Sequence, residues 1–230
     1  MSKHEVIPGW IHGLEEYEQM FDLKPEDFKK SILDFPGSIS SFNAEVHAEA
    51  KHVVSGDAIY AKDMTEMQAY ADKLFALNSE YLTQHADDLL QKGKDGLEFV
   101  FEMWQRNQAR FLEDYAAAKG QGRYERVLMP NLPYETHQFQ LALCSDYVFN
   151  GHAHNDCRPE QVVLELCRVA EEVRIFPLLT ETGDISEWLG PIMLELQNNN
   201  YGVEVRQVSF ENLKGGNAMM RAWAVECTVE

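Results

Sequence analysis

Residues 31–57, SILDFPGSISSFNAEVHAEAKHVVSGD, decide the fold. The stretch opens with a short apolar run that Pro36 and Gly37 close, and it ends with a second apolar run that stops at an acid, Asp57. Between the two runs, Ser40 and Ser41 are favourable N-cap residues for a helix. A strand, a glycine-containing turn, a helix, a second strand and a terminal acid within about 27 residues predict a βαβ unit.

The same alternation continues along the chain. We expect strands at residues 31–35, 52–57, 126–129, 139–145 and 172–179, and helices at residues 14–21, 25–30, 42–50, 63–90, 97–118, 159–169 and 186–199. Residues 202–210 and 219–228 are separated by so short a link that they should pair as an antiparallel hairpin. The pattern predicts an α/β, Rossmann-like fold with a mainly parallel seven-stranded sheet and a C-terminal antiparallel hairpin.

We interpret the whole chain, residues 1–230, as a single domain with two additions. Residues 1–30 carry N-terminal helices. Residues 62–118 are too long for one crossover between parallel strands, which needs only one helix. We therefore expect this block to be a helical cap insertion over the C-terminal ends of the strands.

Composition excludes several classes of function. The chain has 20 basic and 38 acidic residues, a formal net charge of −18, so we expect neither a nucleic-acid partner nor docking on anionic lipid. We find no apolar run of about 18 residues and no signal-type N-terminus, which argues against a membrane or secreted location. The 4 cysteines form no CxxC pair, which is typical of a cytoplasmic protein with reduced thiols. The sequence leaves the oligomeric state open.

The candidate site follows from the predicted sheet. In such sheets ligands bind beyond the C-terminal ends of the strands, where residues 34–41, Asp57, residues 130–133 and residues 144–147 should meet. Gly37 allows close approach of a ligand to the backbone, and the helix that follows offers N–H groups to a carboxylate or phosphate. Asp57 is placed to accept hydrogen bonds from ribose hydroxyls. Together they predict an adenosine-type cofactor, although each alone is also typical of an ordinary turn.

From Ile32 to the C-terminus the sequence resembles the class I S-adenosylmethionine-dependent methyltransferases. The motifs that carry the resemblance are ILDFPGSISSFNAE, HVVSGDAIY, MPNLPYE, FQLALCSDYVF and ELCRVAEEVRIFPLL. The segments SSFNAE and EVRIFPLL are most similar to those of a poorly characterised bacterial branch of that family. The resemblance implies a Rossmann-like methyltransferase fold, S-adenosylmethionine as cofactor and methyl transfer to a small-molecule acceptor.

The resemblance also implies roles for individual residues. Those implied for the cofactor are Asp34, Pro36, Gly37 and Ser38 at the methionine part, Asp57 at the ribose, Ala58, Ile59, Asn131 and Leu132 around the adenine, and Cys144 and Ser145 beneath the sulfonium. Catalytic candidates by position are Asp146, Tyr147 and His152. His152 and His154 lack a third ligand, so we expect loop histidines and no metal site.

One departure from the family pattern keeps an alternative open. The usual three glycines of the first motif are reduced to Gly37, with Pro36 and Ser38 on either side. A non-catalytic binding or interaction protein on a degenerate methyltransferase fold is therefore the second hypothesis. A nicotinamide oxidoreductase is disfavoured, because the sequence contains no GxGxxG motif.

Overall fold

A computed structural model describes residues 10–47, 52–118, 120–150, 157–180, 182–211 and 213–225 of the chain. The strands are β1 (Ile32–Asp34), β2 (Val53–Gly56), β3 (Tyr124–Glu125), β4 (Leu141–Ser145), β5 (Glu172–Phe176), β6 (Tyr201–Gln207) and β7 (Ala218–Ala224). The α-helices are α1 (Leu14–Met20), α2 (Phe42–His47), α3 (Met64–Leu89), α4 (Leu97–Ala118), α5 (Pro159–Val169) and α6 (Leu189–Asn198). Short 3₁₀ helices are η1 (Asp27–Lys29), η2 (Ala58–Ala61) and η3 (Gly93–Gly96).

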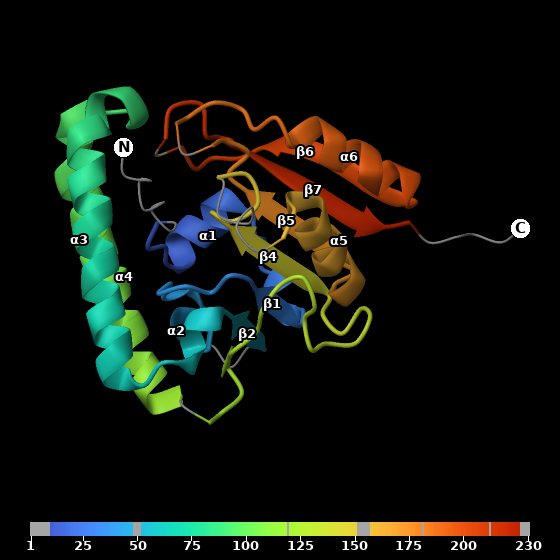
Figure 1. Ribbon diagram of the computed structural model, residues 1–230, viewed down its shortest axis with the longest axis horizontal. Coiled ribbons are helices and arrows are strands. Elements are labelled where there is room, and N and C mark those ends of the chain that lie inside the picture. The colour runs from blue at the N-terminus through green and yellow to red at the C-terminus, as the bar shows by residue number, and fades with distance from the viewer. Residues whose placement is uncertain are drawn as a thin grey trace, which may run out of the picture.

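The strands form one seven-stranded sheet in the order β3-β2-β1-β4-β5-β7-β6 (Figure 1). Neighbours among β1 to β5 pair parallel, whereas β7 runs antiparallel to both β5 and β6. From β1 the sheet extends to β2 and β3 on one side and to β4 and β5 on the other. The direction in which successive strands are added therefore reverses beside β1, which makes this position the topological switch point. The predicted fold class, a mainly parallel seven-stranded sheet with a C-terminal antiparallel hairpin, is confirmed.

The third strand lies two residues earlier than the sequence predicts. We expected residues 126–129, but β3 is Tyr124–Glu125, paired with Ser55 and Gly56 of β2. The reason is that β2 ends at Gly56, so the chain after Glu125 has no neighbouring strand to continue along. The apolar run that suggested a strand therefore enters a loop, where Leu128 is 50% exposed.

The other elements match the expectations with shifted ends. The expected strand at residues 139–145 is shorter, because Phe139 forms only an isolated bridge with Ala170 before β4 begins at Leu141. The second helix is a single 3₁₀ turn, η1. The last residues of the expected helix 42–50, and of the expected strand 219–228 from residue 226 onward, lie outside the described residues.

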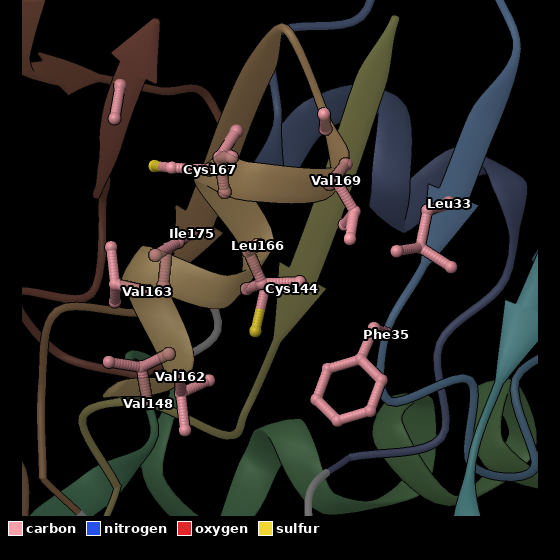
Figure 2. Close-up of a cluster of buried hydrophobic side chains, with 14 of the residues drawn as sticks. Leu33, Phe35, Cys144, Val148, Val162, Val163, Leu166, Cys167, Val169 and Ile175 are labelled. Carbon is pink, nitrogen blue, oxygen red and sulfur yellow. The ribbon is translucent and has the colours of Figure 1, made fainter. Parts of the chain in front are cut away.

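Two apolar layers cover the two faces of the sheet. On one face, Leu33 and Cys144 pack with Val162 and Leu166 of α5, as Figure 2 shows. On the other face, their sequence neighbours Ile32 and Leu143 pack with α1 and α2. This alternation follows from the period of two along a strand, and continuous burial explains why β4 is apolar throughout.

Helices α3 and α4 lie between β2 and β3 in the sequence and run side by side along one end of the sheet (Figure 1). At one end of the pair, the Tyr115 hydroxyl donates to the Tyr60 carbonyl just after β2. At the other end, Leu90 forms a bridge with Leu213 in the loop between β6 and β7. The helix pair thus follows the edge at which the parallel strands end. Among the described residues, none of the helices has the length and apolarity that crossing a bilayer requires.

Candidate functional site

Asp34, the last residue of β1, is completely buried. Its Oδ1 accepts a hydrogen bond from the Tyr17 hydroxyl at 2.8 Å, and its Oδ2 accepts one from Ser55 Oγ at 2.7 Å. Burial raises the pKa of Asp34 to about 7, and the nearby charge of Asp57 adds to the rise, while the two hydroxyl donors oppose it. Asp34 is therefore an internal acid that titrates near neutrality, held by groups of the chain itself.

Asp57 follows β2 and is half-buried. Its Oδ2 accepts from the Ser38 backbone N–H at 2.9 Å, and its Oδ1 accepts from the Ile59 N–H at 3.0 Å as the cap of η2. Burial raises the pKa of Asp57, against the effect of these backbone donors. Because a carboxylate offers about four acceptor positions, Asp57 can fix the turn after β1 and still accept a further hydrogen bond.

Most backbone N–H groups of the turn after β1 donate to acceptors within the chain. Five backbone N–H groups of residues 37–42 have acceptors: Gly37 donates to the Gly56 carbonyl, Ser38 to Asp57, Ser40 to the Gly37 carbonyl, Ser41 to the His12 carbonyl and Phe42 to Ser40 Oγ. These five groups are therefore engaged within the chain, and the expectation that the start of α2 offers N–H groups to a carboxylate or phosphate stays a prediction. The physical reason for this engagement is that the N-terminal segment and β2 close over the turn and supply acceptors there.

Gly37 is required by packing inside the chain. A Cβ at this position would lie 2.7 Å from Ser55 Cβ and closer still to the Tyr60 hydroxyl oxygen. The Tyr60 hydroxyl donates to the Ser38 carbonyl at 2.9 Å, so this ring is fixed over the turn. The group that lies close to the backbone at Gly37 is thus the Tyr60 side chain.

Gly37→Ala is expected to lower the free energy of unfolding by about 1–3 kcal/mol, as overpacking does. Urea denaturation measures the loss. Tyr60→Phe removes the hydroxyl that the new methyl would meet, so it should cost less in the Gly37→Ala background than in the wild type. Gly190→Ala is the control, because a Cβ at Gly190 has nothing within 4 Å. Equal stability of wild type and Gly37→Ala would contradict this account of the turn.

The segment after β4 makes a polar contact with the N-terminal segment. Asp146 Oδ2 lies 2.8 Å from His12 Nε2, and the Asp146 backbone N–H donates to the Phe176 carbonyl at 2.8 Å. His12 is only 2% exposed, and its Nδ1 has no hydrogen-bond partner among the described residues. Trp10 stacks on the His12 ring with centroids 6.4 Å apart. A buried histidine with one committed nitrogen and one unpaired nitrogen therefore adjoins the predicted site residue Asp146.

Tyr17 connects the ends of β1 and β4. Its hydroxyl donates to Asp34 and also lies 3.2 Å from Ser145 Oγ. Complete burial, followed by the charge of Asp34, raises its pKa well above the ordinary value. Neither Tyr17 nor His12 is among the predicted site residues, because their partners lie in distant parts of the chain.

The remaining sequence-predicted residues are spread along the same edge. Tyr147 is half-buried and meets Phe35 edge-on, with centroids 5.2 Å apart. Cys144 packs its side chain into the apolar cluster beneath α5 (Figure 2), and burial raises its thiol pKa well above the ordinary value.

The residues expected around the adenine are only partly grouped. Ala58 is exposed and Ile59 is half-buried in η2, close to Asp57. Asn131 is exposed, whereas Leu132 is buried and donates its N–H to Glu165. Hydrogen bonds therefore connect Ser38, Asp57 and Ile59 directly, while Asn131 and Leu132 belong to the loop before β4.

Of the loop histidines, His152 and His154 both lie outside the described residues. Within the part of the chain that the structure describes, no group of three or more His, Cys, Asp or Glu side chains is placed to hold a metal ion.

Comparison with known proteins gives distant relatives. No family model matches the chain. An uncharacterized protein of Methanocaldococcus jannaschii is 26% identical over 229 residues, covering 95% of this chain and 96% of the relative. That relative is archaeal, so the expected bacterial branch stays a prediction.

Solved structures resemble the fold. A SAM-dependent methyltransferase of Methanosarcina mazei has a TM-score of 0.45 and 10% identity, covering 88% of this chain and 98% of that one. A SAM-dependent methyltransferase of Aquifex aeolicus has a TM-score of 0.42 and 15% identity, covering 91% and 92%. The chain is similar to solved methyltransferases.

Proposed function

We propose that this protein transfers a methyl group from S-adenosylmethionine to a small-molecule acceptor. The observation that carries the proposal is the arrangement of Asp34 and Asp57 at the ends of the neighbouring strands β1 and β2, with Ser38 of the intervening turn bonded to Asp57. This pair of acids lies beside the topological switch point, where open α/β sheets bind their ligands. The antiparallel hairpin of β6 and β7, which the short link between them predicts, also fits the methyltransferase fold.

The residues at this edge fit the nucleoside half of the cofactor. Asp57 retains acceptor capacity for ribose hydroxyls, and Ala58 and Ile59 follow it directly in η2. The methionine half finds no donor among the five N–H groups of the turn that are already bonded. In this proposal Pro36 and Ser38, which are half-buried, border the cofactor through their exposed atoms.

In this reaction the residues of the chain orient the cofactor and the acceptor. S-adenosylmethionine, when bound, supplies a methyl group already activated by its sulfonium. Asp57 and η2 hold the nucleoside, and the residues after β4 position the acceptor, so that the two reactants meet in a fixed geometry. The net charge of −18 supports a small acceptor, because phosphate backbones are bound by clustered lysine and arginine.

Asp57→Asn is expected to weaken binding of S-adenosylhomocysteine by about tenfold or more. Charge-assisted hydrogen bonds to ribose hydroxyls contribute about 1.5–3 kcal/mol each, and about 1.4 kcal/mol corresponds to one decade of affinity. Asparagine keeps an acceptor oxygen for a backbone N–H, whereas Asp57→Ala would remove the acceptors of both Ser38 and Ile59. Isothermal titration calorimetry on the full chain measures the affinity.

Asp63→Ala is the matched control. Asp63 caps α3 by accepting from the Glu66 N–H at 2.9 Å, just as Asp57 caps η2. Asp63, however, follows η2 in the chain and does not bond to the turn after β1. Its loss should cost about 1 kcal/mol of stability and leave S-adenosylhomocysteine affinity unchanged. Equal affinity of wild type and Asp57→Asn would place the ribose elsewhere.

A second candidate is a non-catalytic binding protein on the same fold. The specific observation in its favour is the turn after β1, in which Gly37 and Ser38 donate to acceptors of the chain itself. Calorimetry on the wild type separates the two functions. Absence of S-adenosylhomocysteine and S-adenosylmethionine binding at millimolar concentration would favour the non-catalytic protein.

A further inference from the structure

We propose that β6 is the interface of a symmetric dimer, in which two copies of this chain pair antiparallel, β6 against β6, about a two-fold axis at Val205. The two sheets then continue into each other. This inference is independent of the proposed methyl transfer, because β4, β5 and β7 separate β6 from the candidate site at β1 and β2 (Figure 1). It depends on the outer edge of β6, on the order of its charged residues and on the exposure of Val205.

β6 is the last strand at one end of the sheet. It is 7 residues long, and β7 is its only neighbour among the strands that the structure describes. Just after β6, the Val208 N–H donates to the Asn217 carbonyl, which continues the pairing with β7. Because these bonds alternate along an antiparallel pair, every second residue of β6 counted back from Val208 faces β7. The intervening residues direct their backbone N–H and C=O groups to the outer edge: Tyr201, Val203, Val205 and Gln207. Such an edge is a template for another strand.

The charged residues of β6 are placed to pair with a second copy of the strand. Charge on an edge strand ordinarily prevents edge-to-edge pairing, but Glu204 and Arg206 flank Val205 and lie on one face of the sheet. With the axis at Val205, Glu204 of each copy lies opposite Arg206 of the other. An axis at Glu204 or at Arg206 would place like charges opposite each other, which is destabilising. An axis at Val203 would carry Arg206 beyond the end of the other strand. The order of the charges therefore selects the axis at Val205.

The charge around this edge is balanced within each copy. Glu172 of β5 accepts from Arg221 of β7 at 2.8 Å, and Arg221 also donates to Glu204 at 3.3 Å. Glu204 in turn accepts from Arg206. The row thus alternates in sign up to the edge, although the whole chain carries a net charge of −18. The side chains of Glu204 and Arg206 are 38% and 39% exposed, so both retain surface for the opposite charge across the axis.

Val205 supplies an apolar contact on the other face of the sheet. Its neighbour in β7 is Met220, which is completely buried, whereas Val205 itself is 47% exposed. At the axis the two Val205 side chains lie directly opposite each other, and β-branched side chains pack well against each other across strands. Pairing therefore removes an exposed apolar side chain of each copy from water, which favours association.

Sedimentation velocity of the full-length protein tests the dimer. The wild type should dimerise at micromolar concentration and dissociate to folded monomers on dilution, because the bonds between β6 and β7 lie within each copy. Val205→Pro should weaken the dimer by about tenfold or more, since proline removes an N–H of the outer edge and leaves the bonds to β7 in place. Leu194→Lys is the control, because Leu194 is 59% exposed on α6 and lies outside the proposed interface. A monomeric wild type, or a dimer that Val205→Pro leaves intact or that Leu194→Lys abolishes, would overturn the proposal.

Charge reversal tests the register and does not depend on the proline variant. Arg206→Glu presents two acids to its own copy and Glu204→Arg presents two bases, so each variant alone should dimerise about tenfold or more weakly than the wild type. An equimolar mixture places acids opposite bases at both positions and should form a heterodimer. Circular dichroism checks that each variant is folded. A mixture of folded variants that stays monomeric, or a single variant that dimerises like the wild type, would refute the axis at Val205.

Hydrogen exchange followed by NMR locates the contact on the strand. The backbone amides of Val203 and Val205 should exchange more slowly in the wild-type dimer than in Arg206→Glu at the same concentration. The amides of Gly202 and Glu204 are the internal control, because they face β7 in both proteins. Slower exchange of residues outside β6, with Val203 and Val205 unchanged, would place the interface elsewhere and overturn the proposal.

Discussion

Arg174→Ala is expected to lower the free energy of unfolding by about 3–5 kcal/mol, because it removes one partner of a buried ion pair. Arg174 is 6% exposed, and its Nη1 and Nη2 each donate to the Asp27 carboxylate at 3.1 Å. Nη1 also donates to the Phe21 carbonyl at 2.8 Å. The variant would leave both acceptors buried without this donor and would loosen η1 and the end of α1 from β5.

Urea denaturation of the wild type, Arg174→Ala and Arg206→Ala measures the effect. Arg206 also pairs with a carboxylate, Glu204, but its side chain is 39% exposed, so its loss should cost about 0–1 kcal/mol. Similar losses of unfolding free energy in the two variants would show that the Arg174–Asp27 ion pair stabilises the fold no more than a surface pair does.

The effect of Arg174→Ala should also depend on pH. Although burial alone would raise the pKa of Asp27, hydrogen bonds from Lys30, Lys24 and Arg174 hold it below the ordinary value. Stability from a lowered carboxylate pKa is present above the unfolded value and is lost as pH falls through the folded value. The difference between wild type and Arg174→Ala should therefore shrink below about pH 4.

The sequence predicts the fold well where one element determines its own boundaries. Pro159 begins α5 at the predicted residue, because proline suits the first turn of a helix. β4 reads as a short apolar run because both faces of the sheet are covered there. β3 could not be located in this way: the apolar run that includes Val127 and Leu128 has the composition of a strand, but strand pairing depends on where β2 ends.

The candidate site likewise contains residues that the sequence could locate and residues that it could not. Asp34 and Asp57 could be predicted, since each ends an apolar run and parallel strands end at one edge. Tyr17 and His12 could not. The helical spacing of α1 marks Tyr17 as part of an apolar stripe, yet its hydroxyl reaches Asp34. His12 meets Asp146 across 134 residues, a separation that no local pattern encodes.

Asp34→Asn is expected to stabilise the protein at pH 8, by at most about 4 kcal/mol. The folded chain keeps the Asp34 proton up to about pH 7, whereas the unfolded chain loses it near the ordinary carboxyl pKa of 3.8. Between these values the native state binds more protons than the unfolded state, so stability falls as pH rises. Each pH unit costs at most about 1.4 kcal/mol. Asparagine carries no charge to bury and can still bond both hydroxyls, those of Tyr17 and Ser55, because a hydroxyl accepts as well as donates.

Urea denaturation of wild type and Asp34→Asn from about pH 4 to 8 checks this expectation. The advantage of the variant should be smallest near pH 4, grow while Asp34 is ionised in the unfolded chain but still protonated in the folded chain, and level off above about pH 7, in line with the raised pKa. Asp88→Asn is the control: Asp88 is exposed on α3, and surface changes of this kind stay within about 0.5 kcal/mol at every pH. A variant that is less stable than the wild type at pH 8 would mean that the Asp34 charge is stabilised in the native state, with Tyr17 and Ser55 outweighing the cost of its burial.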